Sequence, residues 1–238
     1  MKIDRVLLLC YTGYPERAER AWRVAAGAAA ELHVPCVDQI WQFPSPWEKW
    51  ILDRAPHIPF LDTHPGCFGA SVGHYRAIKT AAELGSQGAL VLEDDCRFRK
   101  DLDLAAALDA APADADILML DHFSDREAYG PAQDGWTRLR GAYSSACYAA
   151  DAKALRALAS CYETPVTYEG CKLAQVVRTC DNYTHEDYLG RDCRIYAATP
   201  NLAVQCTCPT SNCGARHCIG KYEKLGIDLK DYDGYDEG

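Results

Sequence analysis

The feature that most constrains this chain is an apolar segment, residues 88–92, that ends at three consecutive carboxylates, Glu93, Asp94 and Asp95. The segment has the length of a strand and carries no charge, which predicts a buried β-strand. In open α/β sheets, ligands lie just beyond the carboxyl ends of the strands. Adjacent acids repel one another, so a fold seldom places three of them there without a cation nearby. The pattern therefore predicts a metal or phosphate site, with a solvated acidic turn as the alternative.

Strands and helices are expected to alternate around this segment. Residues 6–10 have the pattern of a first buried strand, and a helix with one apolar face over residues 71–84 leads into the acidic strand. This spacing is typical of a βαβ unit with a parallel sheet. Further strands are expected at residues 34–37, 116–120, 136–139, 142–149 and 195–198. The two segments on either side of residue 140 are expected to pair with each other in antiparallel fashion.

The chain shows no internal repeat and no linker. Its 238 residues are therefore expected to form one α/β domain over residues 1–220, followed by an acidic, mobile tail over residues 221–238. The apolar run near the N-terminus is too short for a signal peptide and leads into a charged helical pattern. No stretch of the sequence is long and apolar enough to span a membrane. A cytoplasmic protein is expected.

The composition narrows the class of protein. With 48% hydrophobic and 25% charged residues, the chain is expected to be globular with a substantial core. Its formal net charge of -9 argues against a broad surface for nucleic acid or anionic membranes, but leaves room for a local basic patch. A nucleic-acid partner is therefore not expected. The 13 cysteines come without a secretion signal, so most of them, such as Cys10, Cys36, Cys147 and Cys161, are expected to be reduced and buried.

A separate cysteine cluster lies near the C-terminus. Its members are Cys206, Cys208, Cys213 and Cys218, with His217 among them. These soft ligands are sufficient for a structural Zn²⁺. The cluster lacks paired Cys-x2-Cys knuckles, so a disulfide or free thiols remain alternatives. A further hypothesis is that His217 completes the shell of a catalytic metal.

Several segments of the chain, taken in order, match the pattern of a known family. They are the strand and arginine-bearing helix start of residues 6–20, the Gly-rich turn 66–69 followed by His74, the acidic motif 90–95, residues 116–120 and 142–158, and the strand 196–200 followed by Gln205. Together they resemble glycosyltransferase family 25, which includes bacterial lipooligosaccharide galactosyltransferases and collagen galactosyltransferases. The resemblance covers most of residues 3–207. Gly73 stands where the family usually has Ser, and the Cys-rich end is not a family feature.

The resemblance implies a fold, a donor and a metal. The fold would be of the GT-A type, a Rossmann-like nucleotide-sugar transferase fold with a mixed, mostly parallel central sheet flanked by helices. The reaction would move a hexose, galactose or glucose, from a UDP-sugar to an acceptor hydroxyl with inversion. The acceptor would be a glycan, a protein or another hydroxyl compound. Mn²⁺ or Mg²⁺ suits hard carboxylate ligands and would neutralise the departing diphosphate.

Roles around the acidic motif follow from this chemistry. Asp95 is expected to be the direct metal ligand, with Asp94 and Glu93 supporting the metal, the ribose or the donor sugar. An inverting transfer needs a base for the acceptor hydroxyl. Glu186 and Asp187, on a late polar loop, are the candidate bases, and Asp121, at the end of another strand, is the alternative. A solvated loop or helix cap remains an alternative for Glu186 and Asp187.

The donor is expected to contact residues near the end of the first strand. Tyr11 and Thr12 are candidates to flank the base and ribose, and Arg17 and Arg20 to meet the phosphates. His74 is expected to contact the diphosphate or to hold the acidic loop. Each of these also has a purely structural interpretation: turn residues, a solvated helix face and a core histidine.

Two other functions remain open from the sequence. A metal-dependent phosphohydrolase would use the same acids. A non-catalytic module that binds nucleotide sugars or glycans would keep the binding residues and lack the base.

Overall fold

The structure is a computed structural model. It describes residues 1–11, 15–42, 46–54, 57–58, 65–123, 128–142, 144–174, 186–190, 192–205 and 215–234. Within these ranges, the side chains of residues 15–16, 42, 46–48, 65–67, 174, 188 and 215–218 are not described.

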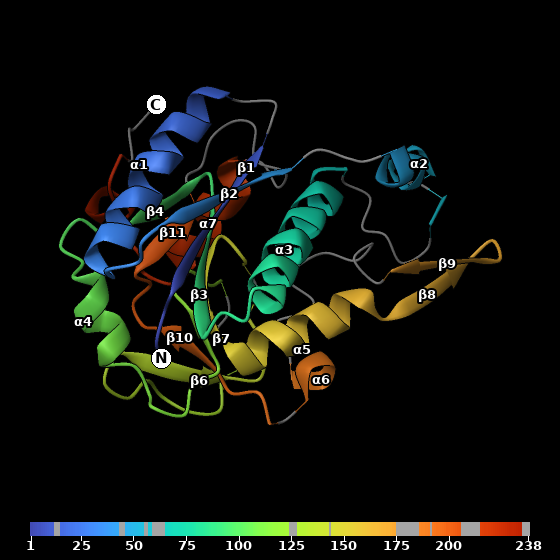
Figure 1. Ribbon diagram of the computed structural model, residues 1–238. Coiled ribbons are helices and arrows are strands. Elements are labelled where there is room, and N and C mark those ends of the chain that lie inside the picture. Colours follow the sequence, from blue (N-terminus) through green and yellow to red (C-terminus); the bar gives the residue numbers. More distant parts are fainter. Residues whose placement is uncertain are drawn as a thin grey trace.

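A mixed sheet forms the centre of the described part of the chain (Figure 1). Its seven strands, in spatial order, are β2 (Val37–Gln42), β1 (Arg5–Tyr11), β3 (Gly88–Glu93), β7 (Cys147–Asp151), β5 (Ile117–Met119), β10 (Ile195–Ala198) and β6 (Trp136–Leu139). The pairings show that β7 and β6 run against the other strands, which all share one direction. Helices flank this sheet, so the predicted α/β fold with a mixed, mostly parallel central sheet is confirmed.

Helices cover both faces of the sheet because successive residues of β1 and β3 point to opposite sides. Leu7, Leu9 and Val91 pack in a core cluster with α3 (Pro65–Glu83) and α5 (Ala152–Glu163). The alternate residues of both strands pack on the other face with α1 (Pro15–Glu31) and α4 (Leu104–Asp109). Figure 1 shows these two pairs of helices on either side of the strands. The sheet is therefore buried on both faces, and its strand ends are the places where polar residues gather.

Smaller elements complete the described structure. They are α2 (Pro46–Arg54), the antiparallel pair β4 (Cys96–Phe98) and β11 (Ala203–Gln205), the hairpin β8 (Pro165–Tyr168) with β9 (Cys171–Ala174), α6 (Glu186–Leu189), α7 (Ala215–Lys224) and the 3₁₀ turn η4 (Leu229–Asp231). In the β4–β11 pair, Gln205 lies opposite Cys96. This register brings a residue from late in the chain directly beside the acidic triplet.

The strand pairing around residue 140 differs from the sequence prediction. β6 and β7 do not pair with each other. β6 is an outermost strand of the sheet and pairs with β10, whereas β7 lies between β3 and β5. The physical reason is burial, since residues 147–150 of β7 are all buried and need a neighbour on each side. The prediction of an antiparallel pair formed by these two segments was wrong.

The C-terminal segment packs against the rest of the domain where the structure describes it. Tyr222, Leu229 and Tyr232 are buried in one cluster with Val204 of β11. The Tyr232 hydroxyl donates a hydrogen bond of 2.7 Å to the backbone oxygen of Asn201. Residues 221–234 thus pack on the domain, which differs from the expected mobile tail because these aromatic and aliphatic side chains gain from burial. Residues 235–238 lie outside the described residues.

The described residues include no helix that combines the length and the apolar character needed to cross a membrane.

The cysteines whose side chains are described carry free thiols. Cys10 and Cys147 are buried, as expected, and Cys161 is partly buried. Cys36 is exposed instead, because it lies in the turn that leads into β2.

Candidate functional site

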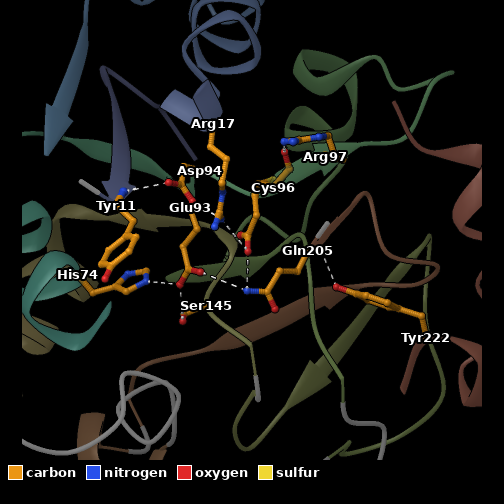
Figure 2. A network of polar contacts seen from close by, with 11 residues as sticks. Tyr11, Arg17, His74, Glu93, Asp94, Cys96, Arg97, Ser145, Gln205 and Tyr222 are labelled. Carbon is orange, nitrogen blue, oxygen red and sulfur yellow. Dashed lines mark hydrogen bonds and ion pairs between the residues drawn. The ribbon is translucent and has the colours of Figure 1, made fainter. Parts of the chain in front are cut away.

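The acidic triplet lies where the sequence predicts it, at the carboxyl end of a buried central strand. Glu93 is the last residue of β3, and Asp94 and Asp95 form the turn into β4. Both aspartates are buried, with 5% and 4% of their surface exposed. Figure 2 shows the partners of the three acids, which come from β1, α1, α3, β11 and the loop before β7. Three carboxylates that are close together and mostly shielded from water repel one another strongly.

Asp94 joins the triplet to the end of the first strand. Its Oδ2 accepts a hydrogen bond of 2.9 Å from the backbone nitrogen of Tyr11, and its Oδ1 accepts one of 2.5 Å from Nη2 of Arg17 (Figure 2). Burial raises the pKa of Asp94, while the positive charge of Arg17 opposes that rise. Tyr11 and Arg17 therefore lie beside the acidic motif, and their contacts with a donor stay predictions.

Asp95 is the least compensated of the three acids. Its Oδ2 lies 3.2 Å from Nη2 of Arg17 and accepts a hydrogen bond of 3.2 Å from Nε2 of Gln205. Its Oδ1 is buried and has no hydrogen-bond partner in the described structure. Burial, followed by the charge of Glu93, raises the pKa of Asp95 to about 8. A buried carboxylate oxygen without a donor is costly, so this atom marks a position suited to a cation or another ligand.

Glu93 is held from three directions. Its Oε1 lies 2.9 Å from Nε2 of His74 and 3.3 Å from Oγ of Ser145, and its Oε2 accepts a 3.4 Å contact from Nε2 of Gln205 (Figure 2). Burial alone would raise the pKa of Glu93, but the hydrogen bond and charge of His74 hold it below its usual value. Glu93 is therefore kept ionised next to Asp95, which increases the negative potential at the site.

His74 is fully buried in α3 and lies between Glu93 and the core. Its Nδ1 is 3.1 Å from the hydroxyl of Tyr148 on β7, and the two rings stack with centroids 5.7 Å apart. This arrangement supports the interpretation that His74 holds the acidic loop. The ring is 0% exposed, so in this structure it is not open to a diphosphate.

Asp121 follows β5 at the same edge of the sheet and is completely buried. Its Oδ2 accepts a hydrogen bond of 2.5 Å from Oγ of Ser144. Its Oδ1 accepts bonds of 3.0 Å from Nδ2 of Asn201 and 2.9 Å from the hydroxyl of Tyr222. Burial raises the pKa of Asp121 to about 7, although these three donors oppose the rise. With no exposed surface, the carboxylate does not reach an acceptor hydroxyl in this structure.

The structure does not bring the other two predicted bases to the triplet. The backbone nitrogen of Glu186 donates a hydrogen bond to the backbone oxygen of Arg140, the residue directly after β6. The last residue of β6, Leu139, pairs with Ile195 at the start of β10. The start of β10 is the opposite edge of the sheet from the end of β3. Glu186 accepts hydrogen bonds from Tyr129 and from Arg140, and Asp187 is mostly exposed. This pair, a buried Glu186 beside an exposed Asp187, therefore forms a compensated cluster away from the acidic triplet.

The remaining predicted residues have different outcomes. Arg20 lies one turn after Arg17 on α1, and its Nε is buried without a hydrogen-bond partner in the described structure. Thr12 lies outside the described residues. The same holds for the zinc candidates Cys206, Cys208 and Cys213, and for the side chains of Cys218 and His217. The zinc site and the metal role of His217 stay predictions.

A bound divalent cation fits the triplet in one specific way. Among the described side chains, no group of three or more His, Cys, Asp or Glu residues is arranged to hold a metal ion. A complete protein cage is therefore not formed by these residues. Mg²⁺, however, is usually held by one or two carboxylates together with substrate phosphates and water. The unpartnered Oδ1 of Asp95 fits that kind of site.

Sequence reasoning missed several residues that shape the site. Gln205 contacts both Glu93 and Asp95, yet the sequence marked it only as part of a family-like closing strand. Ser145 and Tyr222 were not predicted at all. An amide and two hydroxyls carry no sequence pattern of their own. Ser145 precedes β7, Gln205 ends β11 and Tyr222 lies on α7, so only the tertiary structure brings them to the acidic triplet.

A cavity of about 310 Å³ lies at the same edge, beyond Asp121. It is walled mainly by apolar atoms and lies beside the carboxyl ends of β5 and β10 and along β6; its polar lining residues are His122, Thr137, Thr199 and Asn201. The position is one where α/β sheets bind ligands.

No protein-family model matches the chain, and no curated protein matches it in sequence. The structure has similarity to several solved structures. The mannose-1-phosphate geranyltransferase from Thermus thermophilus has a TM-score of 0.42 at 16% identity, covering 82% of this chain and 74% of that one. A glycosyltransferase involved in glycosylation of the major capsid of PBCV-1 has a TM-score of 0.45 at 12% identity, covering 93% and 98%. The galactosyltransferase LgtC, in complex with donor and acceptor sugar analogs, has a TM-score of 0.41 at 15% identity, covering 94% and 97%.

At these identities and TM-scores the matches assign no activity to this chain. Membership of glycosyltransferase family 25 stays a prediction.

Proposed function

We propose that this protein is a glycosyltransferase that moves a hexose, galactose or glucose, from a UDP-sugar to an acceptor hydroxyl, using Mn²⁺ or Mg²⁺. The observation that carries the proposal is the buried, unpartnered Oδ1 of Asp95 beside Glu93 and Asp94, at the carboxyl edge of the sheet. The motif resemblance described for the sequence supports the donor class and the inverting outcome.

The charge balance of the triplet favours a cation and a diphosphate. Arg17 supplies one positive charge against Asp94 and Asp95, and Glu93 faces His74. Burial and the charge of Glu93 raise the pKa of Asp95 to about 8, and a bound cation would hold this carboxylate in its charged form. Asp95, with Asp94 beside it, would hold the metal, which when bound supplies the positive charge that neutralises a departing diphosphate.

Residues of this chain would orient the donor around that position. Arg17 places a guanidinium directly at the two aspartates, where it would attract the donor phosphates. Tyr11 ends β1 next to Asp94, and 45% of its surface is exposed. An exposed aromatic ring beside the acidic turn is suited to stacking on a nucleotide base. Glu93, held by His74 and Ser145, would keep its carboxylate in one position facing the sugar or ribose.

The acceptor would approach the carboxyl edge of the sheet on the side where β5 and β10 end. The cavity bordered by His122, Thr137 and Asn201 lies there. Its mainly apolar wall with a few polar groups suits the face of a sugar ring or an apolar group attached to a hydroxyl. Glycan, protein and other hydroxyl acceptors all remain within the proposal.

A thermal-shift panel combined with a turnover assay tests the proposed function. The purified chain is incubated with UDP-galactose, UDP-glucose, other nucleotide sugars and phosphate esters, each with and without Mn²⁺. We expect a UDP-hexose to raise the melting temperature, and to do so more strongly with Mn²⁺, because a ligand that binds only the folded form stabilises it. Release of UDP is expected to rise when acceptor sugars are added.

The same panel separates the rival functions. Rapid hydrolysis of phosphate esters without any acceptor would indicate a phosphohydrolase. If UDP-sugars bind but no UDP is released with any of the acceptors tested, the protein is a binding module. No thermal shift with any nucleotide sugar, at concentrations up to the millimolar range, would overturn the proposal.

A further inference from the structure

Asp121 is linked through hydrogen bonds to two of the residues that contact the acidic triplet, Ser145 and Gln205, although it touches none of the three acids in the hydrogen bonds described above. It is 0% exposed and accepts three hydrogen bonds, from Ser144, Asn201 and Tyr222. These donors come from the loop before β7, the segment before β11 and helix α7. Two of them lead on to the acidic triplet by separate routes.

The first route runs through a strained turn. Ser144 has a backbone φ of 110°, a region that L-residues with a side chain rarely adopt. Its hydroxyl donates to Oδ2 of Asp121 at 2.5 Å, which holds this conformation. The next residue, Ser145, then donates to Oε1 of Glu93 at 3.3 Å, and the backbone nitrogen of Glu93 donates to the oxygen of Ala146 at 2.8 Å. Asp121 thereby fixes the turn that faces Glu93.

The second route runs through helix α7. The hydroxyl of Tyr222 accepts a hydrogen bond of 2.6 Å from the backbone nitrogen of Gln205 and donates one of 2.9 Å to Oδ1 of Asp121. Because the hydroxyl oxygen accepts from Gln205, its single proton is available for donation to Asp121, which is the acceptor. The side chain of Gln205 then reaches Oδ2 of Asp95 at 3.2 Å and Oε2 of Glu93 at 3.4 Å (Figure 2). Tyr222 thereby sets where the Gln205 amide lies.

From these two routes we infer that Asp121 is a positioning residue: through Ser144 and Tyr222 it fixes the two donors, Ser145 and Gln205, that orient Glu93 and Asp95. An effect of Asp121 on sugar transfer rests on the proposed function, but its effect on the positions of Glu93 and Asp95 does not. This role differs from that of a base, because a base must touch the acceptor hydroxyl. The carboxylates that face the donor would then depend on a residue that never meets the donor.

The test compares D121N with D116N as a matched control. Asp116 precedes β5, whereas Asp121 follows it, and Asp116 is also buried. Asp116 accepts hydrogen bonds from Nζ of Lys153 and from the backbone nitrogen of Arg194, and it lies at the opposite edge of the sheet. Asparagine preserves the shape at either position and replaces one acceptor oxygen by a donor. Y222F is the second variant, which removes only the route through Gln205.

The first readout is the ¹⁵N resonance of the His74 imidazole, assigned with H74N in protein labelled at histidine. His74 Nε2 lies 2.9 Å from Glu93, so this signal reports the position of that carboxylate without any substrate. D121N is expected to shift the His74 ¹⁵N resonance, and D116N is expected to leave this resonance unchanged. The second readout is transfer from the UDP-sugar. D121N is expected to lower kcat/KM by about 10²-fold in the wild-type background, as misplaced catalytic groups do.

Combining D121N with S145A and Q205A decides between the roles. If Asp121 acts through those two side chains, D121N should cost little further activity once they are gone. An unchanged His74 signal in D121N and Y222F, or an equal loss of activity from D121N with and without Ser145 and Gln205, would overturn the inference. If the wild-type protein transfers no sugar, the proposed function fails, and the His74 signal still decides whether Asp121 positions Glu93.

Discussion

Two acidic clusters look alike in the sequence but have opposite surroundings in the fold. The triplet of Glu93, Asp94 and Asp95 lies at the carboxyl edge of the sheet, and the pair of Glu186 and Asp187 lies at the start of β10 on the other edge. Glu186 is buried but accepts hydrogen bonds from a tyrosine and an arginine. In the triplet, one arginine is shared by two aspartates, and one buried oxygen has no partner in the described structure.

The difference shows what distinguishes a structural acid cluster from a candidate site. Both clusters contain a buried carboxylate, so burial alone does not separate them. Compensation does, because a buried carboxylate oxygen without a donor, such as Oδ1 of Asp95, destabilises the folded state and persists only where something else requires it. The first cluster has that property and the second does not.

Replacing Asp95 by Asn is expected to have the largest effect on activity. We expect UDP-sugar turnover to fall by at least about 10²-fold, because charge stabilisation at the departing diphosphate would be lost. The melting temperature is expected to stay constant or rise, since a neutral amide replaces a carboxyl group whose charged form is disfavoured by burial and by Glu93. Asp187→Asn, at the exposed acid of the other cluster, is the control and should keep wild-type turnover. A folded D95N protein with full activity would rule out the metal role.

Removing the arginine that pairs with each acidic cluster should lower the stability of the protein more at the triplet than at Glu186 and Asp187. Arg17→Met leaves Asp94 and Asp95 buried without their cation, and we expect the free energy of unfolding to fall by about 3 kcal/mol. Arg140→Met should cost less, because Arg140 is half exposed and Tyr129 still donates to both oxygens of Glu186. Urea denaturation of the two variants measures both values. Equal losses would show that the clusters do not differ in charge compensation.

The pH dependence of stability should report the buried acid at the candidate edge. The folded state raises the pKa of Asp121 to about 7, so between about pH 4 and pH 7 it binds a proton that the unfolded chain does not. The stability from this proton is complete below about pH 4 and is lost as the pH rises through about 7. The melting temperature of D121N, compared with wild type across this range, should therefore become relatively higher with rising pH. A constant difference would contradict the raised pKa.

The smallest effect is expected at the compensated cluster. Glu186→Gln should leave sugar transfer unchanged and lower the melting temperature slightly, because Gln keeps one oxygen for Tyr129 but loses the charge that pairs with Arg140. A steady-state assay and a melting curve are sufficient. Loss of transfer in a folded E186Q protein would restore the catalytic role that the sequence predicted for this loop and would remove the contrast between the clusters.

Much of the local structure was predictable from short-range patterns. The strand at residues 88–93 and the helix that Asp151 caps follow from apolar runs and capping chemistry within a few residues. The pairing of β7 between β3 and β5 was not predictable, because strand partners lie far apart in the sequence. The start of β2 was also misplaced: the strand begins at Val37, where the predicted strand ends.

By itself, the sequence determined that a buried strand ends at three acids, with Tyr11 and Arg17 following an earlier strand of the same sheet. These features follow from the order of residues along each strand and from the rule that parallel strands end at one edge. Which of these acids are compensated depends on contacts between residues far apart in the chain. Gln205 is 110 residues from Asp95, and Tyr222 is 101 residues from Asp121. Charge balance depends on neighbours in space, and long-range packing alone brings those neighbours together.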